Sequence, residues 1–197
     1  MKMWLVAVFA LVIIIVSIFF SSTATSNAVN NKNDIIVIPV DVYIVDSGSY
    51  SSERTQQNIK DIFSKANTVW REAGIFFQIK SVSIADVNDF IIREMIDGNG
   101  AAIKQTPFYN KDVLNVYMSN FVGGEANGLS MPIDSIIMIS DKTTLNDFRT
   151  LSHEFGHTLG LNHASHPEQL MHAGTNGLHL TKEEVSISRA TALKIFT

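Results

Sequence analysis

Residues 151–163 read LSHEFGHTLGLNH and contain the pattern HExxHxxGxxH, whose fixed positions are His153, Glu154, His157, Gly160 and His163. Two histidines four residues apart on a helix project from the same face, so His153 and His157 can bind one metal ion. Glu154 lies about 100° further round the helix, where its carboxylate can reach a water molecule on that ion without binding the ion itself. The pattern therefore predicts a metal-binding helix that carries its own general base.

The third histidine can reach the same ion only if the helix stops before it. On a continuing helix, His163 would lie about 240° round from His157 and would face the wrong side. Gly160 can end the helix, because glycine adopts the left-handed conformation of a helix C-terminus without a steric penalty. His166 is an alternative third ligand, and the turn at Gly160 favours His163. Three neutral imidazoles leave the fourth position of a tetrahedral zinc ion open, as in catalytic zinc sites.

The extended motif resembles that of the metzincin zinc metallopeptidases. Metzincins carry a methionine in a tight turn beneath the metal (the Met-turn), and Met171 follows the third histidine by eight residues. This interval and residues 180–185 (LTKEEV), which look like the start of a closing C-terminal helix, are similar to the matrixin, or matrix metalloproteinase-like, branch. The resemblance implies an α+β catalytic domain, in which a twisted mixed sheet covers the zinc-binding helix and a small C-terminal subdomain contains one helix.

The chain also departs from the patterns of the known branches. Ala164 stands after the third histidine, where matrixins usually have serine, and Ala173 stands where astacin-like enzymes have a tyrosine. There is no cysteine, so the cysteine-switch latency of many matrixins cannot operate. All six histidines lie between His153 and His179, which argues against a second, structural zinc site of the matrixin kind. We expect one catalytic Zn²⁺ ion.

The N-terminus predicts export. Residues 4–20 form an apolar run, with Lys2 before it and small residues after it that offer cleavage at Ala24 or Ala28. An uncleaved membrane anchor is the alternative, since the run is at the lower limit of the length that spans a bilayer. Lys2 and the amino terminus favour a cytoplasmic N-terminal end under both interpretations. The predicted localisation is therefore secreted or extracytoplasmic, with membrane attachment through residues 4–20 in the second case.

The chain is accordingly divided into a signal peptide or anchor (1–28) and a catalytic domain (29–197), whose upper part (29–160) and lower part (161–197) enclose the substrate cleft. A hydrophobic content of 46% is enough for a packed core without disulfides. The formal net charge of −4 provides no basic surface for nucleic acid. We expect a monomer whose partner is a polypeptide substrate.

Local patterns predict the order of the elements. We expect strands at 35–45, 75–82, 113–118 and 135–140, and helices at 52–73, 89–96, around the zinc motif and at the C-terminus. Pro39 suggests an edge position, a bulge or a strand that begins after it. Thr143 or Thr144 is expected to cap the zinc helix, and Thr181 with Glu184 to form a capping box. The apolar side chains expected to pack beneath the sheet are Leu145, Phe148, Leu151, Phe155 and Leu159.

Two segments have alternative interpretations. Residues 121–130 are rich in glycine, and the resemblance implies an edge strand or loop that binds substrate through Gly124, Ala126 and Asn127, while a flexible hairpin is the alternative. His172 is a further substrate-binding candidate in the pocket wall. Residues 97–100 (DGNG) could begin a Ca²⁺ loop, but they lack a following acidic ligand, and we interpret them as a turn.

Together these features predict a zinc-dependent endopeptidase that hydrolyses peptide bonds of extracellular proteins by a zinc-bound water activated by Glu154. The alternative from a different class is a secreted zinc-containing peptide-binding module without turnover. A zinc hydrolase of non-peptide amides is a third hypothesis, which the metzincin resemblance disfavours.

Overall fold

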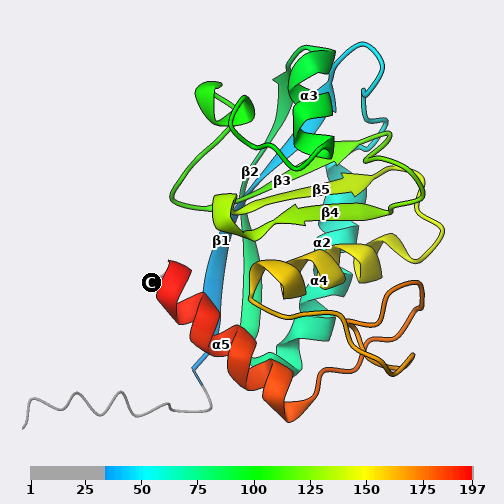
Figure 1. Cartoon of the computed structure of the whole chain (residues 1–197). Helices are drawn as coiled ribbons and strands as arrows, with labels where there is room; N and C mark the ends of the chain where they lie inside the picture. The colour runs from blue at the N-terminus through cyan, green and yellow to red at the C-terminus, as the bar shows by residue number, and fades with distance from the viewer. Residues whose placement is uncertain (1–33, 197) are drawn as a thin grey trace, which may run out of the picture. The chain divides into compact units, whose positions relative to one another are not determined.

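The computed structural model describes residues 34–196, so the predicted signal peptide or anchor at 1–28 lies outside the described residues. Figure 1 shows the arrangement of the elements. The strands are β1 (Ile36–Asp46), β2 (Ile75–Asp86), β3 (Leu114–Ser119), β4 (Gly128–Met131) and β5 (Ile136–Ser140). The α-helices are α2 (Gln56–Trp70), α3 (Asp89–Ile96), α4 (Asp147–Thr158) and α5 (Lys182–Phe196), and short 3-10 helices are η1 (Arg71–Ala73), η2 (Ile103–Gln105) and η3 (Pro132–Asp134).

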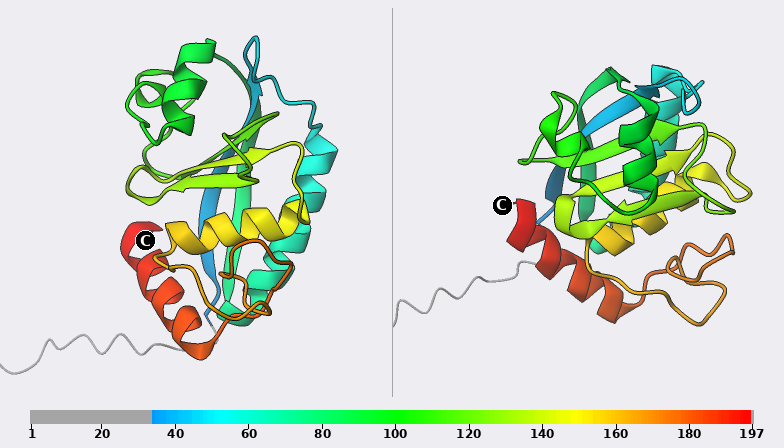
Figure 2. Two further views of the ribbon diagram at one scale, coloured as in Figure 1. Left: turned by 45° about the vertical axis from the view of Figure 1, so that its right-hand side comes forward. Right: turned by 45° about the horizontal axis from the view of Figure 1, so that its top comes forward.

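The five strands form one mixed sheet in the order β2-β1-β3-β5-β4. Four strands run parallel, and the edge strand β4 runs antiparallel to β5. Helices α2, α4 and α5 pack on one face of this twisted sheet, whereas α3 and η2 pack on the other face (Figures 1 and 2). The predicted α+β fold with a mixed sheet over the helix of the zinc motif is therefore confirmed.

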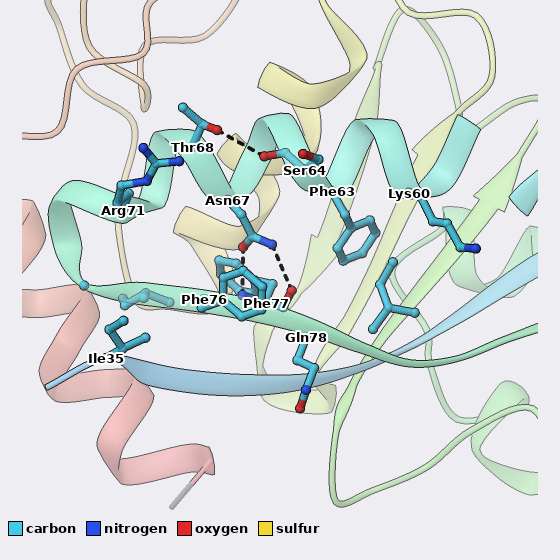
Figure 3. Close-up of a pocket in the computed structure, with 13 residues that line it drawn as sticks. Ile35, Lys60, Phe63, Ser64, Asn67, Thr68, Arg71, Phe76, Phe77 and Gln78 are labelled. Atoms are coloured by element: carbon cyan, nitrogen blue, oxygen red, sulfur yellow. Dashed lines mark hydrogen bonds between the residues drawn. The ribbon is translucent and has the colours of Figure 1, made fainter. Parts of the chain in front are cut away.

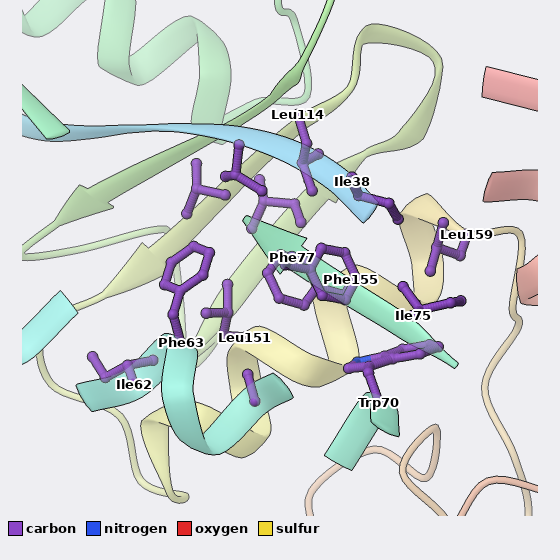
Figure 4. Close-up of a cluster of buried hydrophobic side chains, with 14 of the residues drawn as sticks. Ile38, Ile62, Phe63, Trp70, Ile75, Phe77, Leu114, Leu151, Phe155 and Leu159 are labelled. Carbon is purple, nitrogen blue, oxygen red and sulfur yellow. The ribbon is translucent and has the colours of Figure 1, made fainter. Parts of the chain in front are cut away.

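The core between the sheet and helices α2 and α4 is mostly aliphatic and contains a group of four aromatic side chains (Figure 4). The rings of Phe77 on β2 and Phe155 on α4 stack with centroids 3.6 Å apart, and Phe63 on α2 meets Phe155 edge-on. Trp70 is fully buried, and its indole N–H donates a hydrogen bond of 3.2 Å to the carbonyl of Ser152. Because these contacts with β2 and α2 fix the buried face of α4, the side chains on its other face are presented on a rigid support.

The structure confirms the predicted order of strands and helices, with some changes at their ends. Helix α3 has the predicted bounds, β2 continues beyond 75–82 to Asp86, and Thr181 and Glu184 form the predicted capping box through two reciprocal hydrogen bonds of 2.7 and 3.2 Å. Pro39 lies inside β1, not before it, opposite Gln78 of β2 but beyond the end of β3. Its missing N–H therefore removes no hydrogen bond to β3.

The predicted cap of the zinc helix is wrong. Helix α4 begins after Asn146, and neither Thr143 nor Thr144 caps it. The hydroxyl of Thr143 donates to the carbonyl of Leu145, while Thr144 bonds to the side chain of Asn127, so both side chains are occupied elsewhere. Leu145 consequently lies before the helix and, unlike the other predicted core residues of this segment, faces a cleft.

None of the helices formed by residues 34–196 is both long enough and apolar enough to cross a lipid bilayer.

Candidate active site

A cleft of about 510 Å³ lies along α4, and we call it the α4 cleft. Residues 125–130, which include the start of β4, form one wall, and His163, Ala173 and Gly174 contribute the opposite wall. Its floor is the face of α4 that carries Arg149, Thr150, His153, Glu154 and His157. The HExxHxxGxxH motif thus lines a cleft. Figure 2 shows its helix α4 beside the edge strand β4 of the sheet.

The three predicted histidine ligands converge in this cleft. The Nε2 atom of His157 lies 3.1 Å from Nε2 of His153 and 3.2 Å from Nε2 of His163. Tetrahedral zinc with zinc–nitrogen bonds of about 2.0 to 2.1 Å holds its nitrogen ligands about 3.3 Å apart. The alternative ligand His166 is not part of this group. The arrangement therefore fits one zinc ion bound by His153, His157 and His163.

Backbone carbonyls orient two of the imidazole rings. Nδ1 of His153 lies 2.8 Å from the carbonyl oxygen of Leu170, and Nδ1 of His157 lies 2.9 Å from that of Leu161. When Nδ1 donates to a carbonyl, the lone pair for the metal is on Nε2, which is the nitrogen that faces the common point. Burial lowers the pKa of His153 to about 4 and also lowers the pKa of His157, so both rings are neutral and able to bind metal near pH 7.

The turn after α4 returns the chain to the metal site as predicted. Gly160 has a φ of 84°, and its N–H donates to the carbonyl of His157. The N–H of Leu161 donates to the carbonyl of Gly156, which closes the helix end. His163 can therefore approach the helix face that it would miss if α4 continued.

Glu154 is the buried carboxylate of the cleft. Only 6% of the residue is exposed, and burial raises its pKa to about 7, although a hydrogen bond with Ser130 and the charge of Arg149 act in the opposite direction. The backbone of β4 lies directly over it, because a Cβ atom on Gly128 would be 2.8 Å from Cγ of Glu154. A carboxyl group with a pKa near neutrality can both accept and return a proton.

Met171 is fully buried in the predicted turn. The N–H of His172 donates to the carbonyl of Gln169 at 3.2 Å, which closes a turn that contains Met171. The methionine sulfur packs against Gly156 on α4, where a Cβ atom would collide with it. The absence of a side chain at position 156 thus allows the Met-turn to lie close beneath the histidines.

The predicted substrate-binding residues are only partly brought together. Ala126 and Asn127 line the α4 cleft, whereas Gly124 and His172 are not among its lining residues. Gly128 and Ser130, which also line the cleft, lie in the predicted substrate-binding segment 121–130 but were not named individually, whereas Arg149 and Thr150 were not predicted. Helical periodicity could have indicated the last two, because they precede His153 and Glu154 by one turn.

Protonation of the site predicts how the metal-free protein responds to acid. His153 stabilises the fold above its unfolded-state pKa of about 6.5, and this contribution is lost as the pH falls toward 4. Glu154 contributes below its unfolded-state pKa of about 4.5, and that contribution is lost as the pH rises through 7. The contributions of His153 and Glu154 to the free energy of unfolding therefore change with pH in opposite directions. In Glu154→Gln, the free energy of unfolding should therefore fall by about 3 kcal/mol more between pH 7 and pH 4 than in the wild type.

Denaturant unfolding in the presence of a chelator, at several pH values, measures this difference. Glu53→Gln, which changes an exposed glutamate, serves as the control and should follow the wild type. Equal pH dependence in the wild type and Glu154→Gln would show that the carboxyl of Glu154 has an ordinary pKa.

A larger cavity, of about 710 Å³, lies between α2 and β2 (Figure 3). None of its lining residues is a histidine, aspartate, glutamate or cysteine, so it offers no ligand set for a metal. The side chain of Asn67 accepts a hydrogen bond from the N–H of Phe77 and donates one to its carbonyl, which occupies part of the free edge of β2. The smaller α4 cleft, which contains the three histidines that could hold a metal ion, is therefore the candidate site.

No protein-family model and no curated protein sequence matches the chain. Its structure is similar to an archaemetzincin from Methanopyrus kandleri, with 12% identity, a TM-score of 0.54, and coverage of 80% of this chain and 96% of that one. It is also similar to metalloproteinase-II from Bacteroides fragilis, with 10% identity, a TM-score of 0.52, and coverage of 82% of this chain and 55% of that one. A chain from a chaperone–substrate complex matches with 17% identity and a TM-score of 0.56, over 83% of this chain and 35% of that one.

This chain thus spans about a third of the chain from the complex and about half of metalloproteinase-II. At these identities the similarity concerns the fold. The chain has an α+β fold that it shares with metallopeptidases, and in this fold its three histidines could bind zinc.

Proposed function

We propose that this protein is a zinc-dependent endopeptidase in which Glu154 is the general base. The observation that carries the proposal is the convergence of three imidazole nitrogens beside a buried carboxylate at the floor of an open cleft. The open fourth position expected for a site with three histidines is where a water molecule and a substrate carbonyl can bind.

Glu154 and the histidine ligands have separate roles in the proposed reaction. A bound zinc ion supplies an electrophile and lowers the pKa of its water to about 7. Glu154 takes a proton from the attacking water and then gives it to the departing amine, a double role that its pKa of about 7 permits. His153 and His157 hold their positions through the carbonyls of Leu170 and Leu161.

The edge strand β4 supports a polypeptide as the substrate. Within the described part of the chain, β4 pairs with β5 on one side only, and its residues Gly128, Leu129 and Ser130 line the cleft. An extended peptide can add to such an edge through backbone hydrogen bonds, with alternate side chains directed into the cleft. The spacing of Met171 favours a matrixin-like branch, and the apolar run at 4–20 favours action outside the cytoplasm, so both belong to this proposal.

Incubation of the full chain, purified in detergent and loaded with zinc, with an unfolded protein tests the proposal. We expect internal cleavage that stops with a chelator and returns when zinc is restored. If no cleavage occurs at any zinc concentration although the protein binds both zinc and the unfolded chain, the peptide-binding module becomes the better interpretation.

A further inference from the structure

Arg149 is a buried cation on the floor of the α4 cleft. It lies one helical turn before His153, and only 3% of the residue is exposed. Its Nη2 atom donates to the carbonyls of Leu170, at 2.7 Å, and of His172, and its Nε makes a long contact of 3.5 Å with the carbonyl of Gly177. None of the four ion pairs found among residues 34–196 includes Arg149.

Thr150 presents an unsatisfied hydroxyl in the same cleft. It is 3% exposed and lies one turn before Glu154, and its hydroxyl has no hydrogen-bond partner in the described structure. A buried hydroxyl without a partner costs free energy, and most such groups in proteins are satisfied. An unpartnered hydroxyl next to a cation that has no ion pair, on the floor of one cleft, indicates that a partner comes from outside the chain.

The charge of Arg149 determines what this partner is. Burial lowers the pKa of Arg149, which reports the cost of holding a cation in this place, and the only acidic group that acts against this effect is Glu154. Backbone carbonyls solvate a guanidinium but do not neutralise it. An incoming carboxylate would do so and could accept hydrogen bonds from the guanidinium and from the hydroxyl of Thr150.

We propose that Arg149 and Thr150 form a subsite that binds a carboxylate group of the substrate, one helical turn before the metal ligand His153 and the general base Glu154. This inference rests on the proposed peptidase function and adds a substrate class to it. The carboxylate has two sources, an aspartate or glutamate side chain near the scissile bond or the C-terminal carboxylate of a short peptide.

Matched peptides separate these sources. In a first series, glutamate and glutamine alternate at each position around one scissile bond, and both peptide ends are blocked. In a second series, peptides without acidic residues end in a free carboxylate or an amide one to three residues beyond that bond. We expect kcat/KM to be about tenfold or more higher for the carboxylate member of one series at one position, which identifies the source. Equal values for all pairs would overturn the proposal.

Variants assign the preference to the two residues. Arg149→Met should abolish the glutamate-to-glutamine ratio, or the carboxylate-to-amide ratio, and Thr150→Val should reduce it while keeping the side-chain volume. Thr150→Val also keeps the test decisive if Arg149→Met does not fold. Arg189→Met is the matched control, since Arg189 likewise donates to backbone carbonyls, those of Ala73, Gly74 and Asp34, but does not line the cleft. An unchanged ratio in both cleft variants contradicts the assignment.

Binding to Glu154→Gln distinguishes failure of this inference from failure of the proposed function. In zinc-loaded Glu154→Gln, calorimetry with the same peptides should show about tenfold tighter binding of the carboxylate member. If the wild type cleaves no peptide but this binding preference is present and is lost in the additional Arg149→Met variant, the subsite stands and the peptidase function fails. If the wild type cleaves the peptides but shows no preference for the carboxylate member in rate or affinity, the peptidase function stands and the subsite proposal fails.

Discussion

Replacement of Glu154 by glutamine should reduce the hydrolysis of an unfolded protein by about 10³-fold while zinc remains bound. Glutamine has nearly the same shape but cannot accept a proton at neutral pH, so the variant lacks the base and keeps the packing beneath Gly128. The three histidines do not depend on Glu154, because their partners are the carbonyls of Leu170 and Leu161 and one another. Activity and binding of zinc are therefore separable.

The experiment measures kcat/KM and the bound zinc of each purified protein. Glu183→Gln, which changes an exposed glutamate on α5, is the matched control and should retain wild-type activity. If Glu154→Gln keeps both its zinc and its activity, Glu154 is not the base. Loss of zinc together with activity would instead indicate that the carboxylate organises the metal site.

The metal-binding part of the site could be predicted because its determinants are local. The spacing of His153 and His157 follows from the helical period, and Gly160 marks the place where the chain must turn. The same holds for α3 and for the Thr181–Glu184 box, whose interactions span a few residues. Such interactions join residues that are close in the sequence, so their prediction does not require knowledge of how distant segments pack.

Interactions between distant segments could not be predicted in this way. Thr144 is a good helix cap by residue type, but Asn127, seventeen residues earlier, occupies its hydroxyl, and the helix starts at Asp147 without a side-chain cap. The close approach of Gly128 to Glu154 depends on the position of β4 beside α4. Arg149 likewise finds its carbonyl partners 21 to 28 residues later in an irregular segment, where no periodic pattern exists.

Gly177 lies in the irregular segment between α4 and α5, and a methyl group added there should strongly destabilise the structure. Gly177→Ala is expected to lower the free energy of unfolding by about 3 kcal/mol, since overpacking of a tightly packed position costs about this much. A Cβ atom at position 177 would collide with the carbonyl oxygen of Pro167 and would lie 2.5 Å from the carbonyl carbon of Glu168 and 2.6 Å from the carbonyl oxygen of Gln169. All three are backbone atoms and cannot rotate away as a side chain could.

The backbone that a Cβ atom at position 177 would displace is also connected to the metal site. Residues 168–170 are tied to His179 by two backbone hydrogen bonds, of 3.0 and 2.8 Å, and the carbonyl of Leu170 orients His153. Gly177→Ala should therefore weaken zinc binding as well as stability, although position 177 is not a ligand. Denaturant unfolding of the metal-free protein and a competition titration with a zinc indicator measure the two effects.

Gly174→Ala is the matched control in the same segment. A Cβ atom at position 174 would meet no heavy atom within 4 Å, but Gly174 has a φ of 77°, so alanine should cost only about 1 kcal/mol of left-handed strain. The two substitutions add the same methyl group within three residues of each other, and they differ in whether backbone atoms occupy its place. If they destabilise the protein equally, the contact of Gly177 with residues 167–169 does not hold the Met-turn in place. A selective loss of stability and zinc affinity in Gly177→Ala would identify this contact as the support of the carbonyl that orients His153.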